Sequence, residues 1–343
     1  TTSAIAASST MRRPRISTFS VKGMLSTNWC MGRQVLLLMA AGGRPCSSAA
    51  PRTPSAPGSK YPFLAKQSLG QNFLVDDNLA RAIVASVRDA GVGGSGVVEL
   101  GPGQGALTKH AIERWPHMTA IELDRRAIAL LGTKMPMLKT AHCDMLKVDW
   151  AEVARGVEGG ERLSVITNPP YHLTAELLLK LVLNAEHIGS VVITLQKEAV
   201  ERLLSPPGCK SYTALGVLYA IFAETEVLFD LPPEAFSPAP KVTSTCIRVR
   251  FSGEKLGLEY VAGVHKIAKV AFMERRKMLR QALKGVLAAE PPLGGAGGAL
   301  PERFAALRAE QLKPLHFAEL AEALGYISVS GGCEPDATVD VSV

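Results

Sequence analysis

The stretch V-V-E-L-G-P-G-Q-G, residues 97–105, decides the fold. A short run of β-branched and apolar residues leads into a glycine-rich turn, and residues 106–114 then have the composition of a helix. Glycine allows a backbone to approach a ligand closely and to adopt positive φ. A strand, such a turn and a helix in this order are typical of the first βα unit of a doubly wound sheet. We therefore expect Gly101, Gly103 and Gly105 to contact a bound cofactor.

Acidic residues follow the next two predicted strands. The strand at 118–121 is followed by Glu122, 21 residues after Gly101, where a carboxylate can accept hydrogen bonds from ribose hydroxyls. Nicotinamide and flavin enzymes share this arrangement, but here the glycine spacing is G-x-G-x-G and no second nucleotide-binding half follows. Asp144, after the third strand, could accept a hydrogen bond from an adenine amino group, and the alternative is a solvated loop aspartate.

The tetrapeptide Asn168-Pro169-Pro170-Tyr171 follows the apolar run 163–167 and points to alkylation of a planar nitrogen. An amino group conjugated to an aromatic ring is a poor nucleophile, because its lone pair is delocalised. An Asn oxygen and a prolyl carbonyl can accept its hydrogen bonds, proline adds no competing N–H, and a Tyr ring can stack on a base. A plain strand-ending turn is the alternative, since Asn and Pro are ordinary turn residues. Combined with the glycine turn, the tetrapeptide favours S-adenosylmethionine as the cofactor.

Periodicity over the rest of the chain predicts an α/β fold of the class I, Rossmann-like, S-adenosylmethionine-dependent methyltransferase kind. The expected fold has a doubly wound, mostly parallel sheet that ends in an antiparallel pair of strands. A smaller C-terminal all-helical domain is expected to follow. The expected helices are 79–87, 106–114, 174–184, 198–204, 212–222, 258–287 and 302–324, and the expected later strands are 191–195, 225–229 and 242–251.

Charge is distributed unevenly along the chain. The formal net charge is +7, yet residues 1–75 hold nine basic and no acidic residues, so the remainder carries 29 basic against 31 acidic residues. The net charge of the remainder therefore does not argue for RNA binding, and any RNA binding must depend on local basic patches. The acid-free start is rich in Ser, Ala and Arg, which predicts an organelle transit peptide or disordered segment over 1–59, with chloroplast slightly favoured over mitochondrion. The apolar run 35–41 is too short to span a bilayer.

The domains expected from these patterns are a methyltransferase domain over 60–252, a helical RNA-binding domain over 253–327 and a disordered tail over 328–343. Neither the six cysteines nor the seven histidines show metal-ligand spacing, so we expect no metal site and no disulfide framework. Methyl transfer from a sulfonium needs no metal, because the leaving group is neutral and already activated.

Six segments occur in order along the chain, namely SLGQNFL (68–74) with the glycine turn, IELD (121–124), NPPY (168–171), LQKE (195–198), FSPAPKV (236–242) and RRKMLR (275–280). Together they resemble the ribosomal RNA adenine dimethyltransferases of the KsgA type. The resemblance runs from about residue 66 to about residue 324. The resemblance implies transfer of methyl groups from S-adenosylmethionine to N6 of two adjacent adenosines near the 3′ end of small-subunit ribosomal RNA, as part of ribosome biogenesis. Together with the leading segment, it implies an organellar form of the enzyme.

The resemblance also implies roles for single residues. The target base would be held by Asn168, Pro169, Pro170 and Tyr171. The implied cofactor contacts, beyond the glycines, are Gln71, Asn72, Leu74, Glu122, Asp144 and Asn168.

Two segments are expected to meet RNA. In the proline-braced loop 236–241, Phe236 would stack on or wall the flipped base and Lys241 would lie beside it, and the alternative places Phe236 in the core. On a helix through 275–280, Arg276 and Arg280 would share a face, and such residues contact phosphates rather than bases. The alternative is a solvated face paired with Glu274. The four RNA contacts expected in this second segment are Arg275, Arg276, Lys277 and Arg280.

One departure from the family pattern keeps other functions open. The family usually reads Asn-Leu-Pro-Tyr or Asn-Ile-Pro-Tyr/Phe, whereas this chain has Pro169 at the second position. Asn-Pro-Pro-Tyr is commoner in methyltransferases of DNA adenine and of protein glutamine amides. A third possibility is a non-catalytic ribosome-assembly or transcription factor on the same fold. The expected partner is small-subunit ribosomal RNA or the assembling subunit, and the expected state is a monomer.

Overall fold

The computed structural model describes residues 71–88, 94, 96–157, 162–289 and 298–328. All of them belong to one compact unit, Ser55–Val343. The expected transit segment 1–59 and, apart from Ser328, the expected tail lie outside the described residues. In the part that is described, no helix has the length and apolar character needed to cross a membrane.

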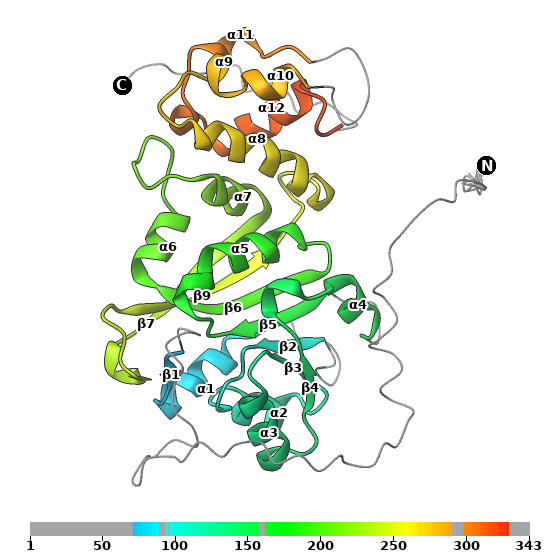
Figure 1. Ribbon diagram of the computed structural model, residues 1–343, viewed down its shortest axis with the longest axis vertical. Helices are drawn as coiled ribbons and strands as arrows, with labels where there is room; N and C mark the ends of the chain where they lie inside the picture. The colour runs from blue at the N-terminus through cyan, green and yellow to red at the C-terminus, as the bar shows by residue number, and fades with distance from the viewer. Residues whose placement is uncertain (1–70, 89–93, 95, 158–161, 290–297, 329–343) are drawn as a thin grey trace, which may run out of the picture. The chain divides into compact units, whose positions relative to one another are not determined.

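Among the described residues, seven strands form one sheet in the order β4-β3-β2-β5-β6-β9-β7 (Figure 1). The strands from β4 to β6 are parallel, and β9 lies antiparallel between β6 and β7. This confirms the expected parallel sheet that ends in an antiparallel pair. The strands are β2 (Val97–Leu100), β3 (Thr119–Glu122), β4 (Lys139–His142), β5 (Leu163–Thr167), β6 (Ile188–Gln196), β7 (Ala223–Leu231) and β9 (Ser244–Phe251).

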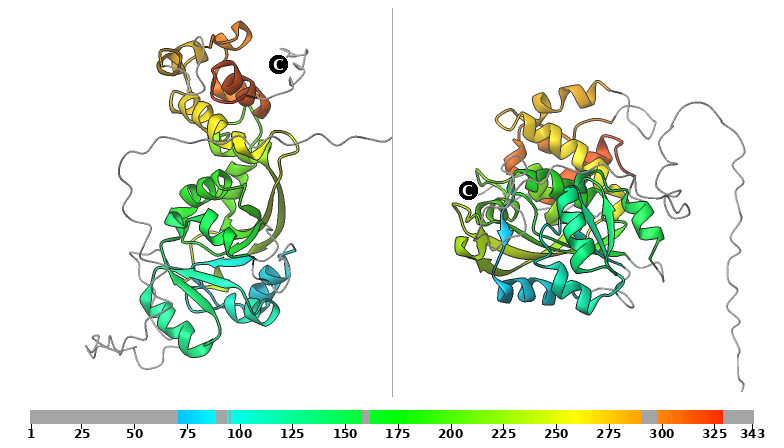
Figure 2. Two further views of the ribbon diagram at one scale, coloured as in Figure 1. Left: turned by 90° about the vertical axis from the view of Figure 1, so that its right-hand side faces the viewer. Right: turned by 60° about the horizontal axis from the view of Figure 1, so that its bottom comes forward.

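Helices cover both faces of the sheet, because alternate strand residues point to opposite sides (Figures 1 and 2). Val97 and Ile166 pack in one buried cluster with α1 (Asp77–Ala85), α2 (Thr108–Arg114) and α3 (Arg125–Lys134). Their neighbours in sequence, among them Val98 and Val165, pack in a second cluster. That second cluster contains residues of α4 (Trp150–Arg155), α5 (Thr174–Leu183), α6 (Lys197–Leu203) and α7 (Ala214–Phe222).

The C-terminal helices extend the second cluster away from the sheet. Val264, Ile267 and Ala271 of α8 (Val261–Met273) belong to the same buried cluster as the strands. Phe272 contacts Tyr212 edge-on, with ring centroids 5.5 Å apart, and stacks on Phe317 of α12 (Pro314–Ala323) at 5.7 Å. The sheet ends at Phe251, next to the expected boundary at residue 252, but the apolar core continues past it, so a separate helical domain stays a prediction.

The expected long helix over 258–287 is wrong beyond Met273. Residues 274–278 form a turn, closed by a hydrogen bond of 2.8 Å from the Lys277 N–H to the Glu274 carbonyl, and α9 (Leu279–Ala282) and α10 (Lys284–Leu287) follow. Met278 pairs with Arg308 in an isolated antiparallel bridge, so a tertiary contact replaces the helical hydrogen bonds here. The expected helix over 302–324 is likewise divided into α11 (Glu302–Ala305), a 3₁₀ turn η8 (Ala309–Gln311) and α12.

A two-stranded sheet that we did not predict joins distant parts of the chain. β1 (Phe73–Leu74) pairs antiparallel with β8 (Phe236–Ser237), and the Val75 N–H donates to the Ala235 carbonyl at 2.8 Å. Two residues are too few for an alternating pattern to be visible in a sequence. The pairing places residues 71–74 beside the carboxyl end of the main sheet, where the candidate site lies.

Candidate functional site

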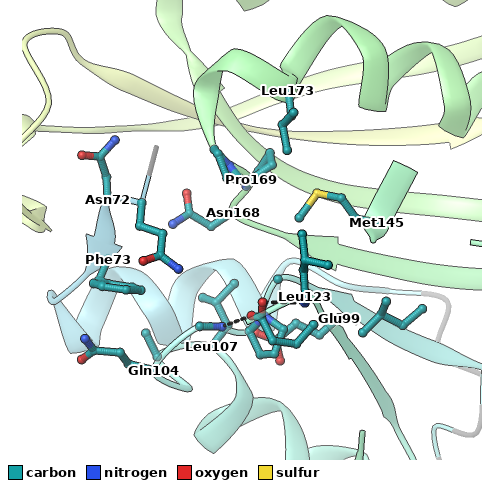
Figure 3. Close-up of a pocket in the computed structure, with 18 of the residues that line it drawn as sticks. Asn72, Phe73, Glu99, Gln104, Leu107, Leu123, Met145, Asn168, Pro169 and Leu173 are labelled. Atoms are coloured by element: carbon teal, nitrogen blue, oxygen red, sulfur yellow. Dashed lines mark hydrogen bonds between the residues drawn. The ribbon is translucent and has the colours of Figure 1, made fainter. Parts of the chain in front are cut away.

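A cavity of about 240 Å³ opens at the carboxyl ends of β2, β3, β4 and β5 (Figure 3). Crevices at this edge are where doubly wound sheets bind ligands. Figure 3 shows Asn72 and Asn168 on one side of the close-up, with Met145 and Leu123 on the other. Eight of the nine expected cofactor contacts line the cavity, namely Gln71, Asn72, Leu74, Gly101, Gly103, Glu122, Asp144 and Asn168.

The glycine turn after β2 brings bare backbone to the cavity wall. Gly101 and Gly103 have φ of +66° and +55°, a left-handed conformation that favours glycine. A Cβ on Gly101 would lie 3.0 Å from the terminal methyl of Met145, and a Cβ on Gly103 would lie 3.1 Å from the ring of Phe73. The turn therefore needs glycine both for its conformation and for the narrow space above it.

Glu122, at the end of β3, holds this turn in place. Its Oε2 accepts a hydrogen bond of 3.0 Å from the Gly103 N–H, and its Oε1 accepts from the N–H groups of Leu123 and Asp124 at 2.7 and 2.8 Å. The side chain is only 7% exposed and lines the cavity. A carboxylate has about four acceptor positions, so one remains for a ligand hydroxyl.

Asp144 lies at the same edge, after β4. Its Oδ1 accepts a hydrogen bond of 3.0 Å from the Leu146 N–H and begins a 3₁₀ turn (Met145–Lys147). That bond fixes the side chain and leaves its second oxygen for a donor in the cavity. Met145 and Leu146, which the turn carries, add apolar surface to the wall.

Glu99 is a site residue that our sequence analysis did not single out. It lies within β2, is 1% exposed and lines the cavity, and its Oε2 has no hydrogen-bond partner among the described residues. Burial raises the pKa of Glu99 to about 8, and the nearby Glu122 carboxylate adds to the rise. The carboxyl group is therefore mainly protonated at neutral pH. An acid within the otherwise apolar run V-V-E-L was the signal that could have revealed it.

The Asn-Pro-Pro turn meets the glycine turn because β5 and β2 are neighbours in the sheet. At the end of β5, the Thr167 hydroxyl donates to the Leu100 carbonyl at 2.9 Å, which ties the two strand ends together. Asn168, Pro169 and Pro170 then line the cavity opposite the glycines. The strand order thus brings residues more than 60 positions apart into one site.

Buried hydroxyls hold two side chains of the tetrapeptide. The Asn168 Oδ1 accepts a hydrogen bond of 2.5 Å from the hydroxyl of Thr194. The Tyr171 hydroxyl lies 2.6 Å from the Ser244 Oγ, and burial raises the pKa of this tyrosine. Tyr171 is not among the residues that line the cavity, so its stacking on a base stays a prediction.

Comparison with known proteins agrees with this geometry. The family model for ribosomal RNA adenine dimethylase matches residues 63–291 of the chain. The chain belongs to this family. A protein of Salinibacter ruber named ribosomal RNA small subunit methyltransferase A is 38% identical over 290 residues, which cover 82% of this chain and 95% of that protein. A protein of the same name from Acidithiobacillus ferrooxidans is 36% identical over 262 residues, 76% of this chain and 94% of the relative.

The fold has a counterpart among solved structures. A dimethyladenosine transferase from Plasmodium falciparum superimposes with a TM-score of 0.57 at 19% identity, covering 72% of this chain and 95% of that one. At this identity the likeness shows the fold, a class I methyltransferase sheet with appended helices. This member of the adenine dimethylase family is therefore an S-adenosylmethionine-dependent methyltransferase.

The cavity residues fit that cofactor. Gly101 and Gly103 leave space that a Cβ would fill, and the unpartnered Oε2 of Glu99 is a buried polar atom suited to a cationic ligand. The remaining acceptor position of Glu122 would take a ribose hydroxyl, and the second oxygen of Asp144 would take the adenine amino group. Apolar side chains of the wall, such as Phe73, would cover the rings.

Two expected contacts of this family member have other roles. Gly105 is absent from the cavity wall, and a Cβ there would lie 3.0 Å from Leu131 and Met135, so it allows α3 to pack closely. Phe236 is 3% exposed within β8 and belongs to the core cluster on the α1 side, which is the core position that the sequence analysis gave as the alternative. Its β8 pairing instead presents Phe73, which we had not singled out, to the cavity.

Arg275 also differs from our expectation, because its guanidinium is engaged within the protein. Nη1 donates to the carbonyls of Lys210 and Tyr212 at 2.6 and 3.0 Å, and Nη2 donates to that of Cys209 at 2.7 Å. Nε donates to Glu310 at 2.8 Å. Arg275 therefore fastens the loop between α6 and α7 to the C-terminal helices, and four of its five N–H donors are used inside the protein.

The other expected RNA contacts remain accessible. Arg276, Lys277, Arg280 and Lys241 are exposed, and Lys277 forms an ion pair of 3.2 Å with Glu274. Because 274–278 is a turn, Arg276 and Arg280 do not share a helical face as predicted. Within the described ranges, no group of three or more His, Cys, Asp or Glu side chains is placed to hold a metal ion.

Proposed function

We propose that this protein transfers methyl groups to N6 of two adjacent adenosines near the 3′ end of small-subunit ribosomal RNA. The observation that carries the proposal is the meeting of Asn168 and the two prolines with the glycine turn in one cavity. Membership of the adenine dimethylase family supports the chemistry, and the names of the bacterial relatives support the small subunit as its target.

The site residues act by holding the target nitrogen. S-adenosylmethionine, when bound, supplies a methyl group on a positively charged sulfur that departs as a neutral thioether. The Asn168 oxygen and the Pro169 carbonyl accept hydrogen bonds from the N6 amino group, which keeps its lone pair directed at the methyl carbon. The nitrogen would form its bond to the methyl carbon as the carbon leaves the sulfur, and it would then lose its proton to water. Positioning supplies most of the rate gain, so no strong general base is needed.

A base inside a helix cannot reach this cavity. The adenosine must leave its stack, at a cost of a few kcal/mol, which favours loops and single-stranded RNA. Exposed Arg276, Lys277, Arg280 and Lys241 would contact phosphates, which supply affinity and salt dependence rather than base identity.

We further propose that the enzyme acts as a monomer during ribosome biogenesis in an organelle, with chloroplast slightly favoured over mitochondrion. The support is the composition of residues 1–75, which hold nine basic and no acidic residues and are rich in Ser and Ala. A fusion of residues 1–75 to a fluorescent protein tests the location. Fluorescence in the cytosol alone would contradict it.

The activity is tested by incubating the full-length protein with labelled S-adenosylmethionine and under-methylated small ribosomal subunits, followed by nucleoside mass spectrometry. We expect label in N6,N6-dimethyladenosine near the 3′ end. Asn168→Ala should abolish it, because the amino group loses its acceptor, while cofactor binding falls only modestly. Full activity in that variant would contradict the mechanism.

Two other results would select the alternatives. Label in DNA or protein but not in RNA would favour the substrates for which Asn-Pro-Pro-Tyr is commoner. Binding to subunits without any label would favour a non-catalytic assembly factor.

A further inference from the structure

Thr194 is a buried hydroxyl beside the site that neither the family pattern nor the cavity lining includes. It lies on β6, which pairs with β5 on one side, and it is directly opposite Cys246 of β9 on the other. Its side chain is 0% exposed. Its backbone is paired with β9, and the residue before it, Ile193, is paired with Thr167 of β5, so the hydroxyl has a fixed position.

The Thr194 hydroxyl donates to the Asn168 Oδ1 at 2.5 Å. Asn168 is the first residue after β5, where the ladder no longer constrains the chain. Rotation about the terminal torsion of an Asn side chain is soft and could exchange the oxygen and the nitrogen. A buried donor on one side of the amide holds the oxygen in place, and the second lone pair of that oxygen stays available.

We propose that Thr194 is a positioning residue that fixes the Asn168 oxygen for the methyl-accepting amino group. The proposal rests on the proposed function, because it assigns the second lone pair of Oδ1 to the N6 amino group. Thr194 does not line the cavity. It acts only through Asn168.

The second methylation should depend on this hydrogen bond more than the first. An unmodified amino group has two N–H bonds, which can meet the Asn168 oxygen and the Pro169 carbonyl together. After one transfer a single N–H remains, so only one of the two acceptors still orients the nitrogen. Any added freedom of Asn168 then weakens orientation most in the second round. Loss of the Thr194 hydroxyl should therefore raise the share of monomethyladenosine.

Thr194→Val tests the proposal, because it removes the hydroxyl and keeps the shape. We expect kcat to fall about tenfold, the Kd for S-adenosylmethionine to stay within about twofold, and the ratio of mono- to dimethyladenosine to rise. Thr194→Ser keeps the hydroxyl and should restore both kcat and the product ratio.

Ser190→Ala is the matched control. Ser164 and Ser190 lie on the same two strands, with their hydroxyls 3.1 Å apart and buried, away from the cavity. Ser190→Ala removes a comparable side-chain contact between β5 and β6, and its ratio of mono- to dimethyladenosine should equal that of the wild type.

A second measurement does not depend on catalysis. The side-chain amide of Asn168 can be assigned in a ¹H–¹⁵N NMR spectrum as the pair of signals that Asn168→Ala removes. These signals should shift or broaden in Thr194→Val and return to their places in Thr194→Ser. Unchanged signals in Thr194→Val would overturn the positioning role even if activity fell.

The remaining outcomes are also decisive. A wild-type product ratio and kcat in Thr194→Val would overturn the proposal, as would failure of Thr194→Ser to restore them. A wild-type protein that does not methylate adenosine would overturn the proposed function itself. In that case the Asn168 signals still report whether Thr194 holds the amide.

Discussion

The rim of the cavity and the basic turn 274–278 differ in how their side chains are placed. At the rim, Glu122 ends a strand and Gly103 and Asn168 follow one, and the parallel sheet brings the strand ends to one edge. In the basic turn, consecutive residues have different roles, since Arg275 is bonded inside the protein while Arg276 is exposed.

The two places differ in how far a local sequence pattern determines where a side chain lies in the folded protein. A strand end has a place in the sheet that follows from alternation and topology. The direction of a side chain in a turn depends on contacts with remote segments, such as the carbonyls of 209–212 that surround Arg275. Variants at both places can therefore test whether the side chains have these different roles.

Arg275→Ala should have the largest effect on stability. It removes four hydrogen bonds from a charged group and leaves Glu310 without its partner at 2.8 Å, so the free energy of unfolding should fall by about 3 kcal/mol. Urea denaturation measures this as a lower midpoint at an unchanged slope. The salt dependence of RNA binding should not change.

Arg280→Ala is its control, because Arg280 is exposed and makes no hydrogen bond or ion pair with other described residues. We expect unchanged stability, and a slope of log affinity against log salt that is smaller by about one. An opposite result, with Arg280 stabilising and Arg275 setting the salt slope, would reverse the roles assigned to them.

Glu99 should make cofactor binding depend on pH. In the free protein its pKa is about 8, and a cationic ligand favours the carboxylate, so binding below pH 8 releases a proton. Affinity for S-adenosylmethionine should therefore rise about tenfold from pH 7 to 9 and then level off. Calorimetry in buffers of different ionisation enthalpy measures the proton release. Glu99→Gln should flatten the profile, and a profile that keeps its shape would exclude Glu99 as the titrating group.

The raised pKa of Glu99 also makes the stability of the protein depend on pH, but stability should fall as pH rises, whereas cofactor affinity should rise. The unfolded chain holds Glu99 at its ordinary pKa of 4.5, so between that value and about 8 only the folded state keeps the proton. The free energy of unfolding of the ligand-free protein should fall as pH rises through this window. Glu99→Gln should remove that part of the fall.

Much of this rim could be predicted from sequence, and the misses have physical causes. Alternation of strands and helices located Glu122 and Asp144, because their place follows from the end of a strand. The bond between Thr194 and Asn168 was not predictable, since it needs the register of two strands whose partners are 26 residues apart. The sequence left open whether Phe236 meets a base or lies in the core, because its strand has two residues, too few to show which face is buried. The end of α8 at Met273 was missed because it depends on pairing of residues 278–279 with residues 307–308, which are remote in the sequence.

Gly103→Ala should have the smallest effect, and it separates backbone strain from crowding at the rim. An alanine there takes a left-handed conformation, at a cost of about 1 kcal/mol, and its Cβ would lie 3.1 Å from the Phe73 ring. Because Phe73 covers the cavity and the Gly103 N–H is held by Glu122, the affinity for S-adenosylmethionine should fall about fivefold.

Gly208→Ala is the matched control. Gly208 has φ of +85°, and a Cβ there would meet no atom within 4 Å, so that variant should lose stability but keep its cofactor affinity. Isothermal titration and thermal unfolding of both variants separate the two effects. Equal losses of affinity would mean that strain alone acts, and that the space between the glycine turn and Phe73 has no part in binding the cofactor. A loss confined to Gly103→Ala would instead place the requirement for glycine in the cavity, where neighbouring strand ends meet.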